Sequence, residues 1–211
     1  LIDGIIYDTP FRGGLSLKLG DYYVKVISVL GFPPMSEPGI LDGLNRADFE
    51  YRWVTRFIPL SKVDSGKELD TIRRSWYGQR KRAFTQLIEA VSRSDSAMVD
   101  LDAMEKFEDA QAAIQTNGND IVSFGYFTSC VIVKHKNEER LKEMVDSITE
   151  IINTKGFATI TEKTNASSAW RGSLPGMARD NVRRPILHSL NLAHLMPISA
   201  IWAGEKWNKH L

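Results

Sequence analysis

The side chains able to do chemistry are few in this chain of 211 residues and form no recognisable catalytic group. The histidines are His135, His188, His194 and His210, and no two of them have the i, i+4 spacing around a glutamate that binds zinc on a helix. We expect His188 and His194 to lie at helix ends or on the surface. The single cysteine, Cys130, excludes an internal disulfide and a cysteine-based zinc site. The sequence predicts no metal site.

Phosphate-binding and nucleophilic motifs are also missing from the sequence. It contains neither G-x-x-x-x-G-K-[ST] nor G-x-G-x-x-G. Ser129 and Ser173 lack the nucleophile elbow of a serine hydrolase. Glu162 is a candidate general base next to a strand end, but we interpret it as a solvated carboxylate at the sheet edge. We therefore predict no catalytic, cofactor-binding or metal-binding residue, and no enzyme activity, in this chain.

A cluster of cations and aromatic rings lies in the stretch RRSWYGQRKR. One hypothesis is a nucleic-acid patch, in which cations bind phosphates and aromatic rings stack on bases. The alternative is a helix whose Trp76 packs inward while basic side chains cover its flanks. We favour the helix, because Glu68, Asp70 and Glu89 reduce the charge and clustered charge usually marks a solvated face. The candidate basic patch consists of Arg73, Arg74, Arg80, Lys81 and Arg82.

The overall composition excludes few classes of protein. Hydrophobic residues make up 43% and charged residues 25%, enough for one core with or without an appendage, and the formal net charge is only +1. No apolar run approaches the roughly 18 residues of a membrane-spanning helix, and no secretory leader is recognisable. Together with the single cysteine, this favours a cytosolic protein. Because neither end has a typical terminal pattern, we expect a piece of a longer polypeptide.

The first third of the chain predicts two strands around a short helix. Residues 22–30 are rich in β-branched and aromatic side chains, as in a strand buried on both faces. Ser36 is placed to cap a short helix that carries apolar residues at 40, 41 and 44. Residues 49–58 alternate, so that Tyr51, Trp53 and Phe57 share one face. Such a face can stack bases, but the helices need an apolar surface, so we predict that Trp53 is buried in the core.

The rest of the chain predicts a helical hairpin, two further strands and two helices. Apolar residues recur at three- and four-residue steps in 69–91 and 101–114, which indicates a hairpin at about 65–117. Strand-forming residues return at 121–134, and Asn137 is placed to cap an amphipathic helix. Residues 157–163 are predicted as the last strand and 165–171 as a short helix. This order predicts an α+β fold: a ferredoxin-like split βαβ, with an antiparallel sheet, helices on one face and the hairpin inserted.

Several stretches of the chain resemble one family. The most specific is SLPG followed by NVRRPILHSLNLAHLMPISAIWAG; the others are VISVLGFP, GILDGLNRADFEYRWVTRFIPL, RRSWYGQRKR, SFGYFTSCVIV and GFATITEKTNASSAW. These stretches resemble the region that precedes the nucleotide-binding domain in the CagE/TrbE/VirB family of conjugal-transfer and type IV secretion ATPases. The resemblance covers nearly the whole chain.

The resemblance implies a non-catalytic amino-terminal domain of a longer ATPase. ATP and Mg²⁺ would bind to a RecA-like domain beyond this chain, so no catalytic residue is assigned here. Residues 1–172 are then the α+β domain and 173–211 a connector towards the motor. The candidate interdomain contacts are Arg183, Arg184 and Asn191. We expect one of the two adjacent arginines to anchor the connector while the other faces the motor, because neighbouring side chains in an extended segment diverge.

The resemblance also implies partners and a location. The parent protein would lie in the bacterial cytoplasm, on the cytoplasmic face of the inner membrane, and would assemble with other secretion-channel subunits and with copies of itself. It would energise pilus assembly or the transfer of DNA and protein. The alternative function is a single-stranded nucleic-acid-binding module that uses the basic helix at 73–82 and the aromatic sheet face.

Overall fold

The computed structural model describes residues 9–14, 16–33, 35–75, 122–177 and 179–196. The chain divides into two compact units, which are described one at a time. The first unit combines Leu1–Phe57 with Tyr126–Leu211, and the second is Ile58–Gly125.

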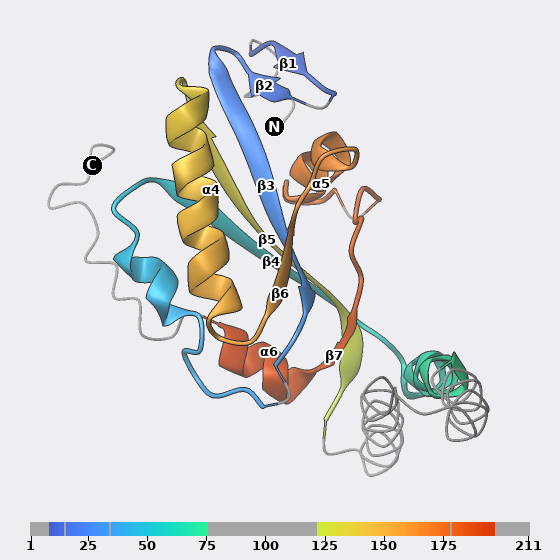
Figure 1. Cartoon of the computed structure of the whole chain (residues 1–211). Coiled ribbons are helices and arrows are strands. Elements are labelled where there is room, and N and C mark those ends of the chain that lie inside the picture. Colours follow the sequence, from blue (N-terminus) through green and yellow to red (C-terminus); the bar gives the residue numbers. More distant parts are fainter. Residues whose placement is uncertain (1–8, 15, 34, 76–121, 178, 197–211) are drawn as a thin grey trace, which may run out of the picture. The chain divides into compact units, whose positions relative to one another are not determined.

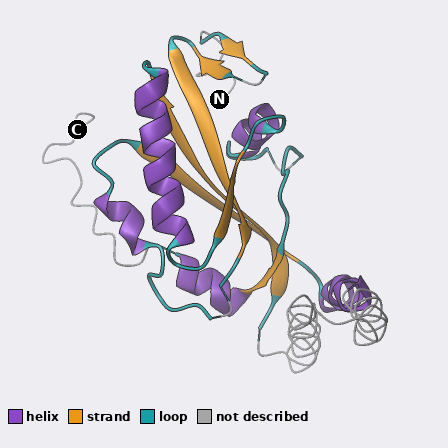
Figure 2. Cartoon of the chain, viewed as in Figure 1, coloured by secondary structure: helices purple, strands orange, loops and turns teal. Residues whose placement is uncertain are grey.

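The first unit is built on an antiparallel sheet (Figures 1 and 2). Its strands follow the order β1-β2-β3-β5-β4, while β6 pairs with β3 and β7 pairs with β5. The strand bounds are β1 (Phe11–Arg12), β2 (Leu17–Leu19), β3 (Tyr22–Gly31), β4 (Tyr51–Pro59), β5 (Phe124–His135), β6 (Ala158–Thr161) and β7 (Ile186–His188).

The strands β6, β3, β5 and β4 lie side by side in the order of a ferredoxin-like split βαβ. In the antiparallel pair of β3 and β5, Val26 lies opposite Ile132. In the antiparallel pair of β3 and β6, Ser28 lies opposite Ile160. The 3₁₀ helix η1 (Asp42–Arg46) lies between β3 and β4 in the chain, and α4 (Glu138–Asn153) lies between β5 and β6. The predicted α+β fold with an antiparallel sheet is confirmed.

Helices cover both faces of the sheet. On one face, Ile27 and Val131 pack in a core with the buried side of α4. On the other face, Val26 and Ile132 pack in a second core with α5 (Ala166–Gly172). Figure 1 shows α4 and α5 on opposite sides of the central strands. The sequence placed the helices on one face only; α5 takes the other because the central strands are apolar on both sides and each side must be shielded from water.

Helix α4 forms where the sequence predicts it. The Asn137 side chain caps the helix by accepting a hydrogen bond from the Arg140 backbone N–H at 3.0 Å, next to two glutamates in the first turn. Gly156 ends the following turn with φ of +81°, a conformation in which a Cβ is strained. The buried stripe of the helix is Leu141, Met144, Val145, Ile148 and Ile152.

The segment after β3 differs from the predicted capped helix. Residues at 40, 41 and 44 are buried as expected, but the helix is a short 3₁₀ turn and Leu41, not Ser36, is its N-cap. Ser36 instead directs its hydroxyl to Asn191 and His194, on a helix near the end of the described chain. A capping residue is satisfied by whichever partner tertiary packing brings closest, and here that partner is distant in sequence.

The strand predicted at residues 157–163 is present as β6, but it is not the last strand of the chain. Strand β7 and helix α6 (Ser189–Leu195) follow, and the Pro185 carbonyl accepts a hydrogen bond from the Phe127 N–H at 2.8 Å. The described residues after 172 thus pack on the first unit. The domain boundary at residue 173 and the connector role remain predictions.

The second unit contains the start of the predicted helical hairpin. Residues 62–75 are helical and Leu69 is buried. The Leu60 N–H donates to the Phe124 carbonyl at 2.9 Å, which joins the two ends of this unit. The remainder of the hairpin predicted at about 65–117, with Trp76, lies outside the described residues.

Candidate functional site

Arg183 is fixed by a buried carboxylate. Its Nε donates to Oε1 of Glu162 at 2.9 Å and its Nη2 donates to Oε2 at 3.1 Å, a bidentate pair. Donating to the Glu162 carboxylate raises the pKa of the Arg183 guanidinium above its usual value. Glu162 is only 3% exposed, so the interpretation of a solvated edge carboxylate is wrong. Arg183 lies 21 residues after Glu162 in the chain. The pair forms only because the segment that carries Arg183 folds back onto the sheet, so the sequence alone does not reveal it.

The backbone around Arg183 is held as well. The Thr128 hydroxyl lies at 2.5 Å from the Arg183 carbonyl and from the side-chain oxygen of Asn181. Asn181 is buried and its side-chain nitrogen has no hydrogen-bond partner. With the oxygen and nitrogen of that amide exchanged, the nitrogen donates to the Thr128 hydroxyl, and the hydroxyl donates to the Arg183 carbonyl. Segment 181–183 is therefore a fixed element of the first unit.

Arg184 points away from this anchor. It is exposed, and its guanidinium carbon lies 5.8 Å from the centroid of the Tyr126 ring, a cation–π arrangement. Pro185 favours an extended conformation at Arg184, which keeps the two neighbouring arginines on opposite sides of the segment. The structure thus distinguishes Arg183, anchored to its own domain, from Arg184, which is accessible.

Asn191 belongs to a polar cluster on α6. Its side-chain oxygen accepts a hydrogen bond from the Ser36 hydroxyl at 3.0 Å, and the same hydroxyl lies 2.9 Å from Nδ1 of His194. His188 is the N-cap of α6 and accepts from the Asn191 N–H at 3.2 Å. Burial, and then the charge of His194, lower the pKa of His188. Both histidines lie at helix ends, as predicted, and Asn191 is partly exposed; its role as an interdomain contact remains a prediction.

Three exposed apolar side chains are near this cluster in the sequence. Leu190 and Met196, on and just after α6, are 54% and 49% exposed, and Met35, next to Ser36, is 84% exposed. We call Met35, Leu190, Met196 and Arg184 the C-terminal surface.

The aromatic face of β4 is a core face. Tyr51, Trp53 and Phe57 pack against the core on the α4 side, and Trp53 Nε1 donates to the Ser129 hydroxyl at 2.9 Å. The rings are half-buried rather than fully buried, because β4 is the last strand in the described sheet order and has a neighbour on one edge. They are not arranged as an open surface for stacking bases.

Two arginines on the other face of β4 have a role that the sequence did not reveal. Arg52 Nη2 donates to the Ser173 hydroxyl at 2.6 Å, and Arg56 donates to the Leu174 and Met177 carbonyls at 3.1 and 2.9 Å. They fix the loop after α5. The alternation placed these arginines opposite the aromatic face, but nothing in the local sequence indicated a loop more than 115 residues away.

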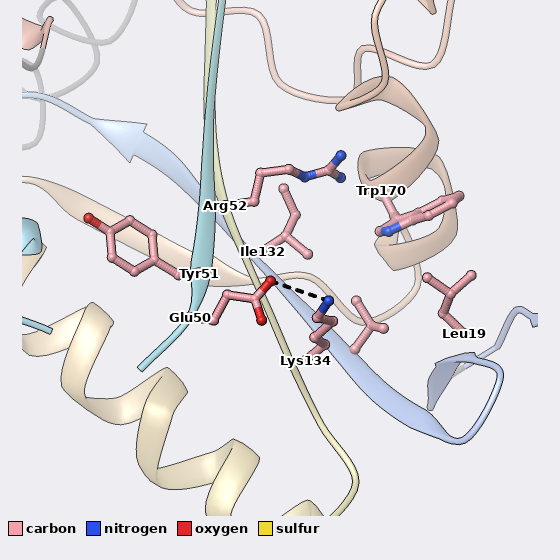
Figure 3. Close-up of a pocket in the computed structure, with 8 residues that line it drawn as sticks. Leu19, Glu50, Tyr51, Arg52, Ile132, Lys134 and Trp170 are labelled. Atoms are coloured by element: carbon pink, nitrogen blue, oxygen red, sulfur yellow. Dashed lines mark ion pairs between the residues drawn. The ribbon is translucent and has the colours of Figure 1, made fainter. Parts of the chain in front are cut away.

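A pocket of about 200 Å³ opens on the same face of the sheet (Figure 3). Val24 of β3 and Ile132 of β5 line it, and Trp170 of α5 forms one wall. Glu50 and Arg52 stand along its opposite side, while the Tyr51 side chain points away from it. The pocket is therefore apolar inside and charged at one margin.

Comparison with known proteins places these features in a family. The model of the CagE, TrbE, VirB family, described as a component of a type IV transporter system, matches residues 79–183. The chain is 35% identical over 192 residues to a probable conjugal transfer protein TrbE of Sinorhizobium fredii (strain NBRC 101917 / NGR234), covering 91% of this chain and 28% of that protein. It is 31% identical over 192 residues to the conjugal transfer protein TrbE of Rhizobium radiobacter, covering 91% and 23%.

This chain belongs to the CagE, TrbE, VirB family. The chain spans about a quarter of the length of the two relatives. The family match includes Glu162 and ends at Arg183, so it contains both members of the buried ion pair. Family membership makes the chain a component of a conjugal-transfer or type IV transport system.

Of the candidate basic patch, the structure describes only Arg73 and Arg74. Arg73 and Arg74 both form ion pairs with Asp70, at 2.5 and 2.6 Å, which neutralises some of their charge. Arg80, Lys81 and Arg82 lie outside the described residues.

Two kinds of feature are absent from the described residues. No group of three or more histidine, cysteine or acidic side chains is arranged to hold a metal ion in the portion of the chain that the structure describes. Within those same ranges, no helix has the length and apolar character needed to cross a membrane.

Proposed function

We propose that this chain is a non-catalytic, protein-binding module of a longer conjugal-transfer ATPase. In this proposal ATP and Mg²⁺ bind to a separate motor domain of the same polypeptide. The module contacts that motor, neighbouring copies and other channel subunits at the cytoplasmic face of the inner membrane. Support comes from the names of the two relatives, both conjugal transfer proteins, and from their greater length.

The observation that carries the proposal is the divergence of Arg183 and Arg184. Arg183 binds Glu162 inside the module, whereas Arg184 is exposed to solvent, as are the apolar side chains of the C-terminal surface. Arginine and methionine, both exposed on the C-terminal surface, are among the residues enriched at protein interfaces. The fixed backbone at 181–183 holds the adjacent Arg184 in place.

The experiment compares alanine variants of the two arginines. Arg183→Ala removes a charge-assisted bidentate bond and should destabilise the module by about 1.5–3 kcal/mol in thermal or urea unfolding. Arg184→Ala should leave unfolding unchanged within about 0.5 kcal/mol, because it is a surface substitution. In the intact transfer protein, Arg184→Ala should lower conjugation frequency although the variant protein accumulates normally.

The matched control is Arg179→Ala, an exposed arginine in the same region of the chain. It should change neither unfolding nor conjugation frequency. If Arg184→Ala and Arg179→Ala both support normal transfer, the proposed role of the C-terminal surface is wrong.

The alternative function, binding of single-stranded nucleic acid, has no observation in its favour among the described residues. The aromatic face packs in the core, and Arg73 and Arg74 share one aspartate. A titration with single-stranded DNA at two salt concentrations tests this alternative, because phosphate-driven binding weakens steeply with salt.

A further inference from the structure

The pocket between β4 and α5 has rigid apolar walls. Val24, Ile132 and Trp170 are each less than a tenth exposed, so they are held by the second core rather than free to collapse into the pocket. The Trp170 ring stacks on Phe11 with ring centroids 4.8 Å apart, which fixes its position. Leu19 completes the apolar lining from β2. The cavity is thus formed before any ligand arrives.

The size of the pocket suits one bulky apolar side chain. A cavity of roughly 150 Å³ lined by apolar groups admits benzene, and this one measures about 200 Å³. A phenyl ring or a branched aliphatic side chain therefore fits inside it, whereas a whole folded element does not.

Positive charges outnumber negative ones at the margin of the pocket. Glu50 and Lys134 neutralise each other, with Nζ of the lysine 3.3 Å from the carboxylate (Figure 3). Arg52 forms no ion pair with any described residue, and its one hydrogen bond among them is from Nη2 to the neutral Ser173 hydroxyl. Arg56, further along the same face of β4, likewise donates only to carbonyl oxygens. This margin carries a net positive charge, which favours a carboxylate beside the apolar group.

A peptide suits this site better than a nucleic acid does. One face of the Trp170 ring is already occupied by Phe11, and the ring is 7% exposed, so it does not offer the open aromatic platform on which bases stack. A nucleic acid also needs a row of cations along its backbone, and here Glu50 interrupts the positive margin. A peptide needs only one apolar anchor and one or two carboxylates.

We infer that this pocket binds an acidic segment of another transport subunit, with one aromatic or branched apolar side chain in the cavity and a neighbouring carboxylate on Arg52. The guanidinium nitrogens that Ser173 does not use supply the donors for that carboxylate. The inference rests on the proposed function as a protein-binding module, but it uses a surface different from the C-terminal surface.

Three synthetic peptides test the inference on the whole 211-residue chain. The probe is Ac-Ser-Glu-Phe-Glu-Ser-NH₂. One control replaces both glutamates with glutamine, and the other replaces the phenylalanine with serine. Binding is followed by calorimetry and by the indole N–H resonance of Trp170 in ¹⁵N NMR spectra, assigned with Trp170→Phe. The probe should shift that resonance, and each control peptide should bind at least fivefold more weakly.

Two variants of the chain locate the site. Arg52→Gln should weaken probe binding about tenfold, to the level of the glutamine peptide, while the matched control Arg179→Gln should not change it. Leu19→Trp should also weaken binding, because the larger side chain fills the mouth of the pocket without altering Arg52. The second variant keeps the test decisive if the loss of the Ser173 bond destabilises the first.

Three results would overturn the inference: equal binding of all three peptides, unchanged probe binding by Leu19→Trp, or displacement of the probe by a ten-nucleotide oligo-dT. These outcomes are independent of the conjugation assay on Arg184. A peptide that binds in the pocket, together with normal transfer by Arg184→Ala, would uphold this site while rejecting the C-terminal surface.

Discussion

At the scale of single residues, the pair of Glu162 and Arg183 shows how burial decides the value of a charge. Glu162 is almost completely buried, while the Arg183 side chain is 28% exposed. The same kind of contact on α4, between Arg140 and Glu143, is exposed to solvent. A charged group that loses its partner inside a protein keeps the cost of its desolvation, whereas a surface group recovers water.

Glu162→Ala should therefore destabilise the chain by about 1.5–3 kcal/mol, because it removes two charge-assisted bonds from Arg183. Glu162→Gln should cost less, since the amide oxygen still accepts one of them. The matched control is Glu143→Ala, which breaks the exposed pair with Arg140 and should change stability far less, because solvent screens that pair. Urea unfolding measures all three variants. Equal losses for Glu162→Ala and Glu143→Ala would contradict the role assigned to burial.

His188 gives the chain a predictable response to acid. Burial and the charge of His194 lower its pKa below the ordinary value of about 6.5. Just below that value the unfolded chain binds more protons than the folded one, so this stabilisation is complete above about pH 6.5 and is lost as the pH falls towards the lowered pKa. Protonation at Nδ1 also removes the acceptor that caps α6.

His188→Asn should make stability less dependent on pH between about 7.5 and 5.5, because asparagine caps a helix without titrating. The measurement is the free energy of unfolding at several pH values for the parent and the variant. Parallel curves through this range would show that His188 does not carry the effect.

At the scale of elements, β4 is an edge strand that works on both faces. Its aromatic residues close the core under α4, while Arg52 and Arg56 on the opposite face hold the loop after α5. The strand is only half-buried, since one of its edges has no strand partner among the described residues.

Trp53→Ala should consequently cost about 2–3 kcal/mol, below the roughly 3–5 kcal/mol that a fully buried aromatic ring loses. Trp53→Phe keeps most of the ring area but leaves the buried Ser129 hydroxyl without the indole donor, at about 1–3 kcal/mol. The free energy of unfolding in urea measures both. A loss larger for Trp53→Phe than for Trp53→Ala would rule out ring burial as the main contribution.

At the scale of the whole molecule, the chain is expected to act through its surfaces. Its sequence lacks a loop that cradles phosphates with a lysine, so the isolated chain should not bind ATP in calorimetry with Mg²⁺ present. ATP turnover that persists through rigorous purification would contradict this prediction. The control is the intact transfer protein, which should bind and hydrolyse ATP under the same conditions.

Local sequence was sufficient to predict the class of fold, the family and the elements of local origin. The alternation of β4, the apolar stripe of α4 and its Asn137 cap depend on residues within a few positions of one another, which is why periodicity predicts them. The ordered stretches that resemble the family are likewise a property of the chain alone. The adjacency of Arg183, Arg184 and Pro185 was enough to predict that one arginine anchors and the other diverges.

Long-range packing was needed to establish which arginine anchors, where α5 packs and what Ser36 binds. Glu162 and Arg183 meet across 21 residues, Arg52 and Ser173 across 121, and Ser36 and Asn191 across 155. No local pattern encodes such pairs, because each polar side chain has several possible partners of the same chemistry until tertiary folding brings one of them close. The apolar pocket beside Arg52 has the same origin, since its walls come from four strands and a helix that packing alone brings together.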